Sequence, residues 1–403
     1  MEWMDGGVCA AKGFRAGAVH CGIKASQKKA DVAVIVSDCS CSAAAVYTKN
    51  LVKAAPLHVT KTHLADGTAQ AIIANSGNAN ACAPRGEQNA VREAAAAAKL
   101  LGLSEQNVLV ASTGVIGKEL PVDCIEAGLP GIQLTYDDSE QAAQAIMTTD
   151  TKLKTCAVQF ELNGICCHLG GICKGSGMIH PNMGTMLCFL TTDAKIASSV
   201  LEKALQEVVR TTFNRVTVDG DTSTNDMCIV LANGLAGNEA LTSANGAAYE
   251  AFLQALHAVT EQLAKKIAAD GEGASRLISC TVSGSADEKT AEALAKSICG
   301  SSLVKAAVFG ADANWGRVLC AMGYSGQQFD PETVTIRFAS KAGALTVCEA
   351  GRGVAFSEEL AKKILSEPEI EICAELGAGS GAATCWGCDL TYDYVKINGD
   401  YRT

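Results

Sequence analysis

The chain has 403 residues, of which 48% are apolar and 19% are charged, so it can bury a large core in one layered unit or two to three modest domains. Its net charge of −10 argues against nucleic acid or an anionic membrane surface as a partner. The 19 cysteines come without a visible secretory signal, and no apolar run is long enough to span a bilayer. We therefore expect reduced cysteines and a cytoplasmic protein.

Short apolar, β-branched runs alternate along the chain with amphipathic stretches. The runs predicted as strands are Val32–Val36, Ala71–Ala74, Val108–Ala111, Met186–Leu190, Met227–Leu231, Leu277–Val282, Leu303–Phe309, Val334–Phe338 and Ile370–Ala374. The segment Asp389–Ile397 alternates in the manner of a further strand, with Tyr392 and Tyr394 on one face.

Helices are predicted from apolar stripes of period 3.6 and from their caps. They are Gln88–Leu101, ended by Gly102; Asp193–Arg210, with Asp193 as N-cap; Tyr249–Ala269, ended by Gly271; and a helix that opens on the capping-box pair Ser285 and Glu288. The order of elements is not a clean βαβ repeat, which favours an α+β fold of stacked sheets covered by helices over a doubly wound sheet.

The run from Lys174 to Leu187 has the composition of a self-cleaving site. Thr185 opens an apolar stretch, and three glycines, a proline and an asparagine before it can hold unusual backbone geometry. The Thr185 hydroxyl could attack the carbonyl of Gly184, form an ester, and leave Thr185 as a new N-terminus. The freed α-amine, with a pKa near ~8, could then act as the base for that hydroxyl. An ordinary strand threonine is the alternative.

The same run resembles the processing site of the ornithine acetyltransferase family, the bifunctional enzymes of arginine biosynthesis that also include N-acetylglutamate synthase activity. The resemblance extends over nearly the whole chain. Its further motifs are Ala11–Phe14, Thr48–Asn50, Asn75–Cys82, Ser112–Gly117, Met147–Thr151, Val218–Asp226, Asp270–Ala274, Ala311–Arg317 and Tyr394–Thr403. The family usually has alanine before the cut, whereas this chain has Gly184, which could change the cleavage rate without forbidding the chemistry.

The resemblance implies a layered αββα arrangement, shared with certain self-processing aminopeptidases. It implies cleavage into fragments 1–184 and 185–403, which would assemble as an α₂β₂ heterotetramer. The implied reaction moves acetyl from N2-acetylornithine to glutamate through an acetyl-threonine intermediate, with acetyl-CoA as a donor in some members. No cofactor and no metal are implied.

The resemblance also implies residue roles. Thr185 would be the nucleophile, and Thr113 with Gly114 would form the oxyanion hole; the alternative for that pair is a tight turn at the end of a strand. The implied substrate-binding residues are Thr148, Lys174, Thr185, Glu272, Asn398 and Thr403. Taken alone, Lys174 and Glu272 would be surface charges, and the two C-terminal residues a frayed end.

Three other features are interpreted as structural. His180 lacks an assignable carboxylate partner and precedes a proline, so we expect it to shape the cleavage loop. The pair Cys385 and Cys388 has no second pair at ligand spacing, and the glycine-rich run 377–381 lacks a nucleotide-binding pattern. Two other functions remain open: an amidase or aminopeptidase with the same nucleophile, and a binding protein that is never processed.

Overall fold

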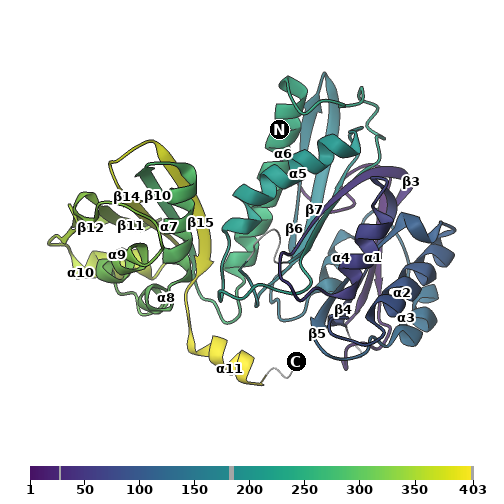
Figure 1. The fold of residues 1–403 in the computed structure, drawn as a ribbon, viewed down its shortest axis with the longest axis horizontal. Helices are drawn as coiled ribbons and strands as arrows, with labels where there is room; N and C mark the ends of the chain where they lie inside the picture. Colours follow the sequence, from purple (N-terminus) through teal and green to yellow (C-terminus); the bar gives the residue numbers. More distant parts are fainter. Residues whose placement is uncertain (27–28, 181–185, 401–403) are drawn as a thin grey trace.

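The computed structural model describes residues 1–26, 29–180 and 186–400. Its strands form two sheets, which Figure 1 shows as separate bodies at the two ends of the molecule. The larger sheet has the order β1-β6-β7-β8-β9-β3-β4-β5, with β2 also paired to β3. Its strands are β1 (Glu2–Met4), β2 (Phe14–Val19), β3 (Val32–Tyr47), β4 (Thr68–Asn78), β5 (Val108–Val115), β6 (Lys154–Leu162), β7 (Ile165–Lys174), β8 (Leu187–Thr192) and β9 (Met227–Ala232).

The long strand β3 folds the larger sheet into two layers. Its first part pairs with β2 and β4, and its last part, from Ser42 to Tyr47, pairs with β9. The register to β4 shifts between Val36 and Cys41, which is where the strand bends from one layer to the other. One layer therefore contains β2, β4 and β5, and the other contains β6 to β9.

Alternating side chains build three cores from these two layers. In β8, Leu187 and Phe189 pack between the layers, while Cys188 and Leu190 pack on the outer side with α5 and α6. In β4, Ile72 is in the middle core and Ile73 is in the outer core with α2. The helices around the two layers are α1 (Ala55–His63), α2 (Gly86–Leu101), α3 (Val122–Gly128), α4 (Ser139–Ile146), α5 (Ser198–Thr211) and α6 (Ala247–Ala269). The predicted αββα layering is thus confirmed.

The smaller sheet forms a second body with its own core. Its order is β13-β12-β11-β14-β10-β15. The elements of this body are β10 (Leu277–Ser285), α7 (Glu288–Gly300), α8 (Ser302–Phe309), α9 (Trp315–Gly323), β11 (Thr335–Ser340), β12 (Gly343–Glu349), β13 (Arg352–Gly353), α10 (Glu358–Leu365), β14 (Glu369–Glu375) and β15 (Gly381–Cys388). From β15 the chain returns as α11 (Tyr392–Asp400) toward the layered body (Figure 1). Short 3₁₀ helices lie at Glu105–Asn107, Leu129–Gly131, Phe213–Arg215 and Pro331–Thr333.

Two predicted strands are helices in the structure. The run Leu303–Phe309 lies in α8, where Ser301 caps the helix by accepting from the backbone N–H of Val304. Apolar runs this short do not distinguish a strand from a buried helix. The alternating segment 389–397 lies largely in α11, which has no buried residue, so its alternation does not reflect a buried sheet face. The other predicted strands are confirmed, although β3 continues to Tyr47, well beyond the predicted end at Val36. The strands that were not anticipated are β1, β2, β6, β7, β12, β13 and β15.

Two predicted helix caps are also wrong. The helix after Asp193 begins only at Ser198, and the buried Asp193 carboxylate instead accepts from the backbone N–H groups of Lys12 and His168. The helix expected from Ser285 and Glu288 is capped by Asp287, which accepts from the N–H of Thr290. At α7 a neighbouring carboxylate takes the capping position, whereas α5 begins after Ala197 without a side-chain cap.

Within the described ranges, no helix is long and apolar enough to cross a membrane. The pair Cys385 and Cys388 lies buried in β15. The glycine-rich run 377–381 joins β14 to β15 and packs closely, since a Cβ on Gly379 would lie 2.4 Å from the carbonyl oxygen of Ser285. Among the residues that the structure describes, no group of three or more His, Cys, Asp or Glu side chains has the arrangement of a metal site.

Candidate active site

Six of the predicted site residues line one small cavity of about 130 Å³. They come from five parts of the chain: Thr113 and Gly114 from the end of β5, Thr148 from the loop after α4, Lys174 from the end of β7, Glu272 from the loop after α6, and Asn398 from α11. The remaining predicted site residues, Gly184, Thr185 and Thr403, lie outside the described residues. The structure therefore brings together every predicted site residue that it describes.

Lys174 is a buried cation whose partner is a hydroxyl group. Its side chain is at the end of β7, the residue is only 9% exposed, and Nζ donates to Oγ1 of Thr113 at 3.2 Å. The interpretation of Lys174 as a surface charge is therefore wrong. In the sheet, Lys174 pairs with Leu187, and the N–H of Met227 donates to the carbonyl of Met186. The two residues that follow Thr185 in the sequence are thus fixed beside Lys174.

Gly114 occupies a position that only glycine fits. Its φ is +133°, and a Cβ there would lie 2.4 Å from the carbonyl carbon of Gly77 on the paired strand β4. Such close backbone approach occurs here between paired strands, beside an irregularity in the register of β4 and β5, so the alternative of a tight turn is wrong. The end of β5 thus brings Thr113 and Gly114 to the wall of the cavity.

Glu272 supplies a buried carboxylate to the same cavity. It is 8% exposed, so the surface-charge interpretation is wrong here too. Nδ2 of Asn398 donates to Oε2 of Glu272 at 2.8 Å, which ties α11 to the cavity. Gly177 permits this placement, because a Cβ there would lie 2.3 Å from the carboxyl carbon of Glu272. Asn398 is therefore part of the cavity and not a frayed end.

Comparison with known proteins decides the family. A family model described as the ArgJ family matches residues 15–403. This chain belongs to the ArgJ family. The predicted membership is thereby confirmed, and with it the predicted class of enzyme, a bifunctional acyltransferase of arginine biosynthesis.

Relatives in the ArgJ family match the chain over its full length. The arginine biosynthesis bifunctional protein ArgJ of Symbiobacterium thermophilum is 52% identical over 407 residues, with 100% of both chains covered. The protein of the same name from Caldanaerobacter subterraneus subsp. tengcongensis is 48% identical over 406 residues, again with 100% of both covered. A solved structure of ornithine acetyltransferase from Mycobacterium tuberculosis in complex with ornithine is 37% identical, has a TM-score of 0.41, and covers 44% of this chain and 95% of that chain.

A buried ion network next to the cavity of this ArgJ-family chain was missed by the sequence analysis. Nζ of Lys154 lies 2.7 Å from the carboxylate of Asp150 and 2.5 Å from that of Asp270. Asp150 in turn accepts from the N–H groups of Thr148 and Gly175, the latter being the residue after Lys174. Burial alone would raise the pKa of Asp150, but Lys174 and Lys154 outweigh it and lower that pKa to about 2.

Asp270 connects the same network to the Glu272 side of the cavity. Its carboxylate accepts from the N–H groups of Thr151 and Lys152, and its carbonyl accepts from Oγ of Ser176 at 2.6 Å. The carbonyl of Ser176 accepts from the N–H of Glu272. The signal that could have found this network was present, since Asp150 and Asp270 both lie in motifs that match the family.

The cavity of this ArgJ-family chain has a further wall that was not predicted as a site. Ser223, Thr224 and Asn225 line it, and all three belong to the family motif Val218–Asp226. Nδ2 of Asn225 donates to the carbonyls of Ala79 and Ser112, so this wall is attached to the strand that carries Thr113. The hydroxyl groups of Ser223 and Thr224 add hydrogen-bonding capacity to the cavity near the end of β5.

His180 does not line the cavity, in agreement with the structural role expected for it. Its Nδ1 lies 3.0 Å from Oγ1 of Thr217, and its carbonyl accepts from Oγ1 of Thr222. Burial, with a contribution from Lys296, lowers the pKa of His180 to about 4, so the ring is neutral at pH 7. These contacts hold the chain that leads to the predicted cleavage site.

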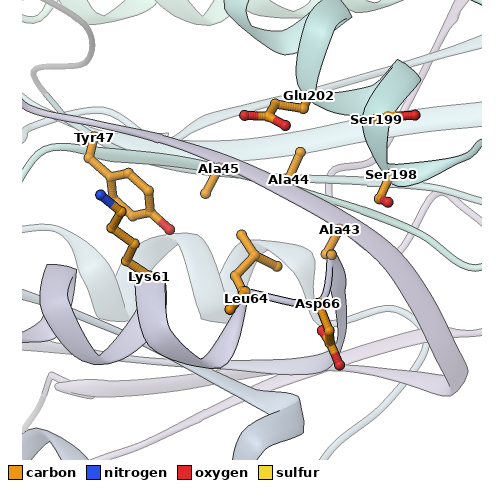
Figure 2. A pocket seen from close by; sticks show the side chains of 12 residues that line it. Ala43, Ala44, Ala45, Tyr47, Lys61, Leu64, Asp66, Ser198, Ser199 and Glu202 are labelled. Atoms are coloured by element: carbon orange, nitrogen blue, oxygen red, sulfur yellow. The ribbon is translucent and has the colours of Figure 1, made fainter.

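Figure 2 shows a larger hollow of about 390 Å³ that lies elsewhere, between α1 and α5. Tyr47 and Lys61 stand on one side of it and Glu202 on the other, over a floor of alanines from β3. None of the described residues that line it is a predicted site residue. Size alone therefore does not identify the reactive site in this ArgJ-family protein.

Proposed function

We propose that the chain transfers an acetyl group from N2-acetylornithine to glutamate by a ping-pong mechanism with an acetyl ester on Thr185. The observation that supports this most is the convergence of Thr113, Gly114, Lys174 and Glu272 on one cavity beside the strand that follows Thr185. Membership of the ArgJ family supports the same reaction.

In the first half-reaction, the Thr185 hydroxyl attacks the acetyl carbonyl of N2-acetylornithine. The C–N bond breaks, ornithine leaves with a proton passed on by the Thr185 α-amine, and the acetyl group remains on the threonine oxygen. The Thr113 hydroxyl and the Gly114 N–H stabilise the oxyanion, and each such donor is worth about 2.7–4 kcal/mol of barrier. In the second half-reaction, the amine of glutamate attacks the ester and regenerates the free hydroxyl. One amide is exchanged for another, so no external energy source is required.

The charged residues of the cavity match the charges of the two substrates. Both substrates carry an α-carboxylate, for which the Lys174 ammonium is a suitable partner. Ornithine also carries a side-chain ammonium, which suits the buried Glu272 carboxylate, while Thr148 and Asn398 offer polar groups to both substrates. Thr403, which lies outside the described residues, is assigned the same role from the family resemblance alone. The hydrogen bond from Asn398 to Glu272 leaves one carboxylate oxygen for the ligand among the contacts that the structure describes.

We further propose that the active form is made by cleavage between Gly184 and Thr185. Fragments 1–184 and 185–403 would stay in one body, because β8 and β9 of the second fragment lie between β7 and β3 of the first. An α₂β₂ assembly and a cytoplasmic location belong to this proposal. The word bifunctional in the names of the relatives supports acetyl-CoA as a second acetyl donor.

The intact mass of the denatured protein tests maturation. The wild type should give two fragments that meet between Gly184 and Thr185, and Thr185→Ala should give one uncut chain. A single uncut wild-type chain would remove the free amine on which the mechanism depends.

Kinetics test the reaction itself. Initial rates with N2-acetylornithine and glutamate varied together should give parallel double-reciprocal plots, and the fragment 185–403 should carry an acetyl adduct when glutamate is withheld. Intersecting plots without an adduct contradict the ping-pong route. Release of free acetate at the same rate with and without glutamate would instead make the protein a hydrolase.

A further inference from the structure

Lys24 lies outside the cavity and contacts the backbone next to two of the segments that line it. Its Nζ donates to the carbonyl of Met147 at 2.9 Å, to that of Ala145 at 3.2 Å and to that of Ala30 at 3.3 Å. The first two carbonyls end α4, where helical carbonyls lack partners and a positive charge is favourable. Met147 directly precedes Thr148, so Lys24 fixes the start of the loop that lines the cavity.

The same side chain also lies beside Gly77 of β4, the strand that pairs with the end of β5 that carries the predicted oxyanion donors. A Cβ placed on Gly77 would lie 3.1 Å from Cγ of Lys24, and Gly77 is the residue whose carbonyl carbon closely approaches Gly114. The neighbouring Ser76 donates through Oγ to the carbonyl of Ala145, which Lys24 also reaches. Lys24 therefore binds the backbone just before Thr148 and lies beside Gly77, against which Gly114 packs.

The position of Lys24 is itself fixed by a buried carboxylate. Asp31 is fully buried and accepts from the backbone N–H groups of Cys21, Gly22, Ile23 and Lys24. Four donors on one carboxylate hold the loop from residue 21 to residue 24 in one conformation. The Lys24 side chain thus extends from a rigid base toward α4.

We propose that Lys24 is a positioning residue that holds the Thr148 loop against the paired ends of β4 and β5, which carry Gly77 and Gly114, and so sets the affinity for both substrates. This inference rests on the proposed acetyl transfer and deepens it. Lys24 does not line the cavity itself. Its loss should therefore weaken substrate binding more than it slows the chemical steps.

The charge on Lys24 is necessary for this role. Three carbonyl acceptors require all three protons of an ammonium, and a neutral amine has only two. Burial lowers the pKa of Lys24 to about 8, with further lowering from Lys29 of the same loop and Lys174 of β7 and opposing contributions from Asp31 and Asp150. The clamp should therefore weaken as the pH rises through about 8.

The first test compares substitutions at Lys24 with a control in the same loop. Lys24→Met should raise KM for both N2-acetylornithine and glutamate at least fivefold at pH 7.5 while kcat stays within about twofold. Lys24→Arg should restore most of the affinity, because it keeps a cation with several donors. The exposed Lys29 provides the control: Lys29→Met should leave kcat unchanged and should raise neither KM, because its loss removes a charge that lowers the pKa of Lys24 and so favours the ammonium. Unchanged KM values in Lys24→Met would overturn the proposal. A fivefold fall in kcat without a rise in KM would overturn it as well.

The second test uses the pH dependence and does not need the methionine variant to fold. In the wild type, KM should rise between pH 7 and pH 9, whereas in Lys24→Arg it should stay flat, because a guanidinium remains charged throughout. Titration of the substrates and of Thr185 affects both enzymes equally and cancels in their ratio. A constant wild-type KM over this range contradicts the proposal. A wild type without acetyl transfer would instead count against the proposed function.

Discussion

Nζ of Lys174 and Oγ1 of Thr113 meet at 3.2 Å across the two layers of the larger sheet, one residue at the end of β7 and the other near the end of β5. The contact joins the residue predicted to hold a substrate carboxylate to one predicted to stabilise an oxyanion. The hydrogen bond restricts both side chains, so a change at Lys174 should also alter the position of the Thr113 hydroxyl.

Replacing Lys174 should therefore impair both properties at once. Lys174→Met should lower kcat/KM for acetyl transfer by about 10²–10³, the range seen when one preorganised donor to a developing charge is removed. Steady-state kinetics on variant protein with confirmed cleavage measure this. Lys152→Met, an exposed lysine near the same loop, should retain wild-type kinetics. A loss below threefold for Lys174→Met would contradict the role.

The close packing of Gly114 against Gly77 gives a second prediction. Gly114→Ala should abolish most of the activity and lower thermal stability, because its Cβ has no space and its φ is unfavourable for alanine. Gly117→Ala is the matched control: its φ is also positive, at +81°, but no atom lies within 4 Å of the added Cβ. Thermal unfolding and activity should separate the two variants, and equal effects would mean that the close contact is unimportant.

His180 predicts a particular dependence of stability on pH. Its pKa is about 4 in the folded state and near ~6.5 when unfolded, so the unfolded state takes up the proton first as the pH falls. The wild type should lose up to about 1.4 kcal/mol of unfolding free energy per pH unit between pH 6.5 and pH 4, relative to His180→Asn. Denaturant unfolding at several pH values measures this difference. His58→Asn, at an exposed site, should track the wild type throughout.

Asp219 predicts a separate effect on maturation. Its carboxylate accepts from the N–H groups of Met178 and Ile179, and Met178 has the positive φ of +55° that non-glycine residues rarely adopt. Asp219→Asn should slow self-cleavage several-fold, since an amide offers one acceptor oxygen where the carboxylate offers two. A time course of intact mass after expression measures the rate. Asp221→Asn, an exposed neighbour, should cleave at the wild-type rate, and equal rates for all three proteins would exclude this role.

The Lys154 network predicts a large loss of stability. Lys154→Met would leave the carboxylates of Asp150 and Asp270 buried without their common cation. Removal of one partner from a buried ion network typically costs about 3–5 kcal/mol. The free energy of unfolding measures this, with Lys152→Met as the exposed control. A change below about 1 kcal/mol would show that solvent or rearrangement compensates for the lost charge.

Elements of the layered fold could be predicted from the sequence where a residue pattern is compatible with only one type of secondary structure. Long stripes such as Tyr249–Ala269 have only the helix as an outcome, and α6 matches this prediction within two residues. The run Leu303–Phe309 was too short to decide, and a serine cap outside the run made it a helix. The terminal segment 389–397 failed for another reason: its role is to carry Asn398 to Glu272, which no local pattern encodes.

Some residues of the candidate site could be predicted from the sequence and others could not. The convergence of Thr113, Lys174 and Glu272 followed from family motifs, not from local chemistry, because each residue alone resembled a turn or a surface charge. The residues that hold these site residues in place could not be predicted from the sequence. Lys24 and Lys154 act through contacts to residues about 120 positions away, and only the fold reveals those partners.

The insertion of β8 and β9 between β7 and β3 has a consequence for the mature protein if it is cut at the proposed bond. An intact precursor refolds as one molecule, and its refolding rate does not depend on concentration. A cleaved protein that has been fully unfolded must first find its other half, so its recovery becomes a second-order process that fails on dilution. Cleavage would thus leave the native structure unchanged, but the unfolded fragments could no longer regain it by a unimolecular reaction.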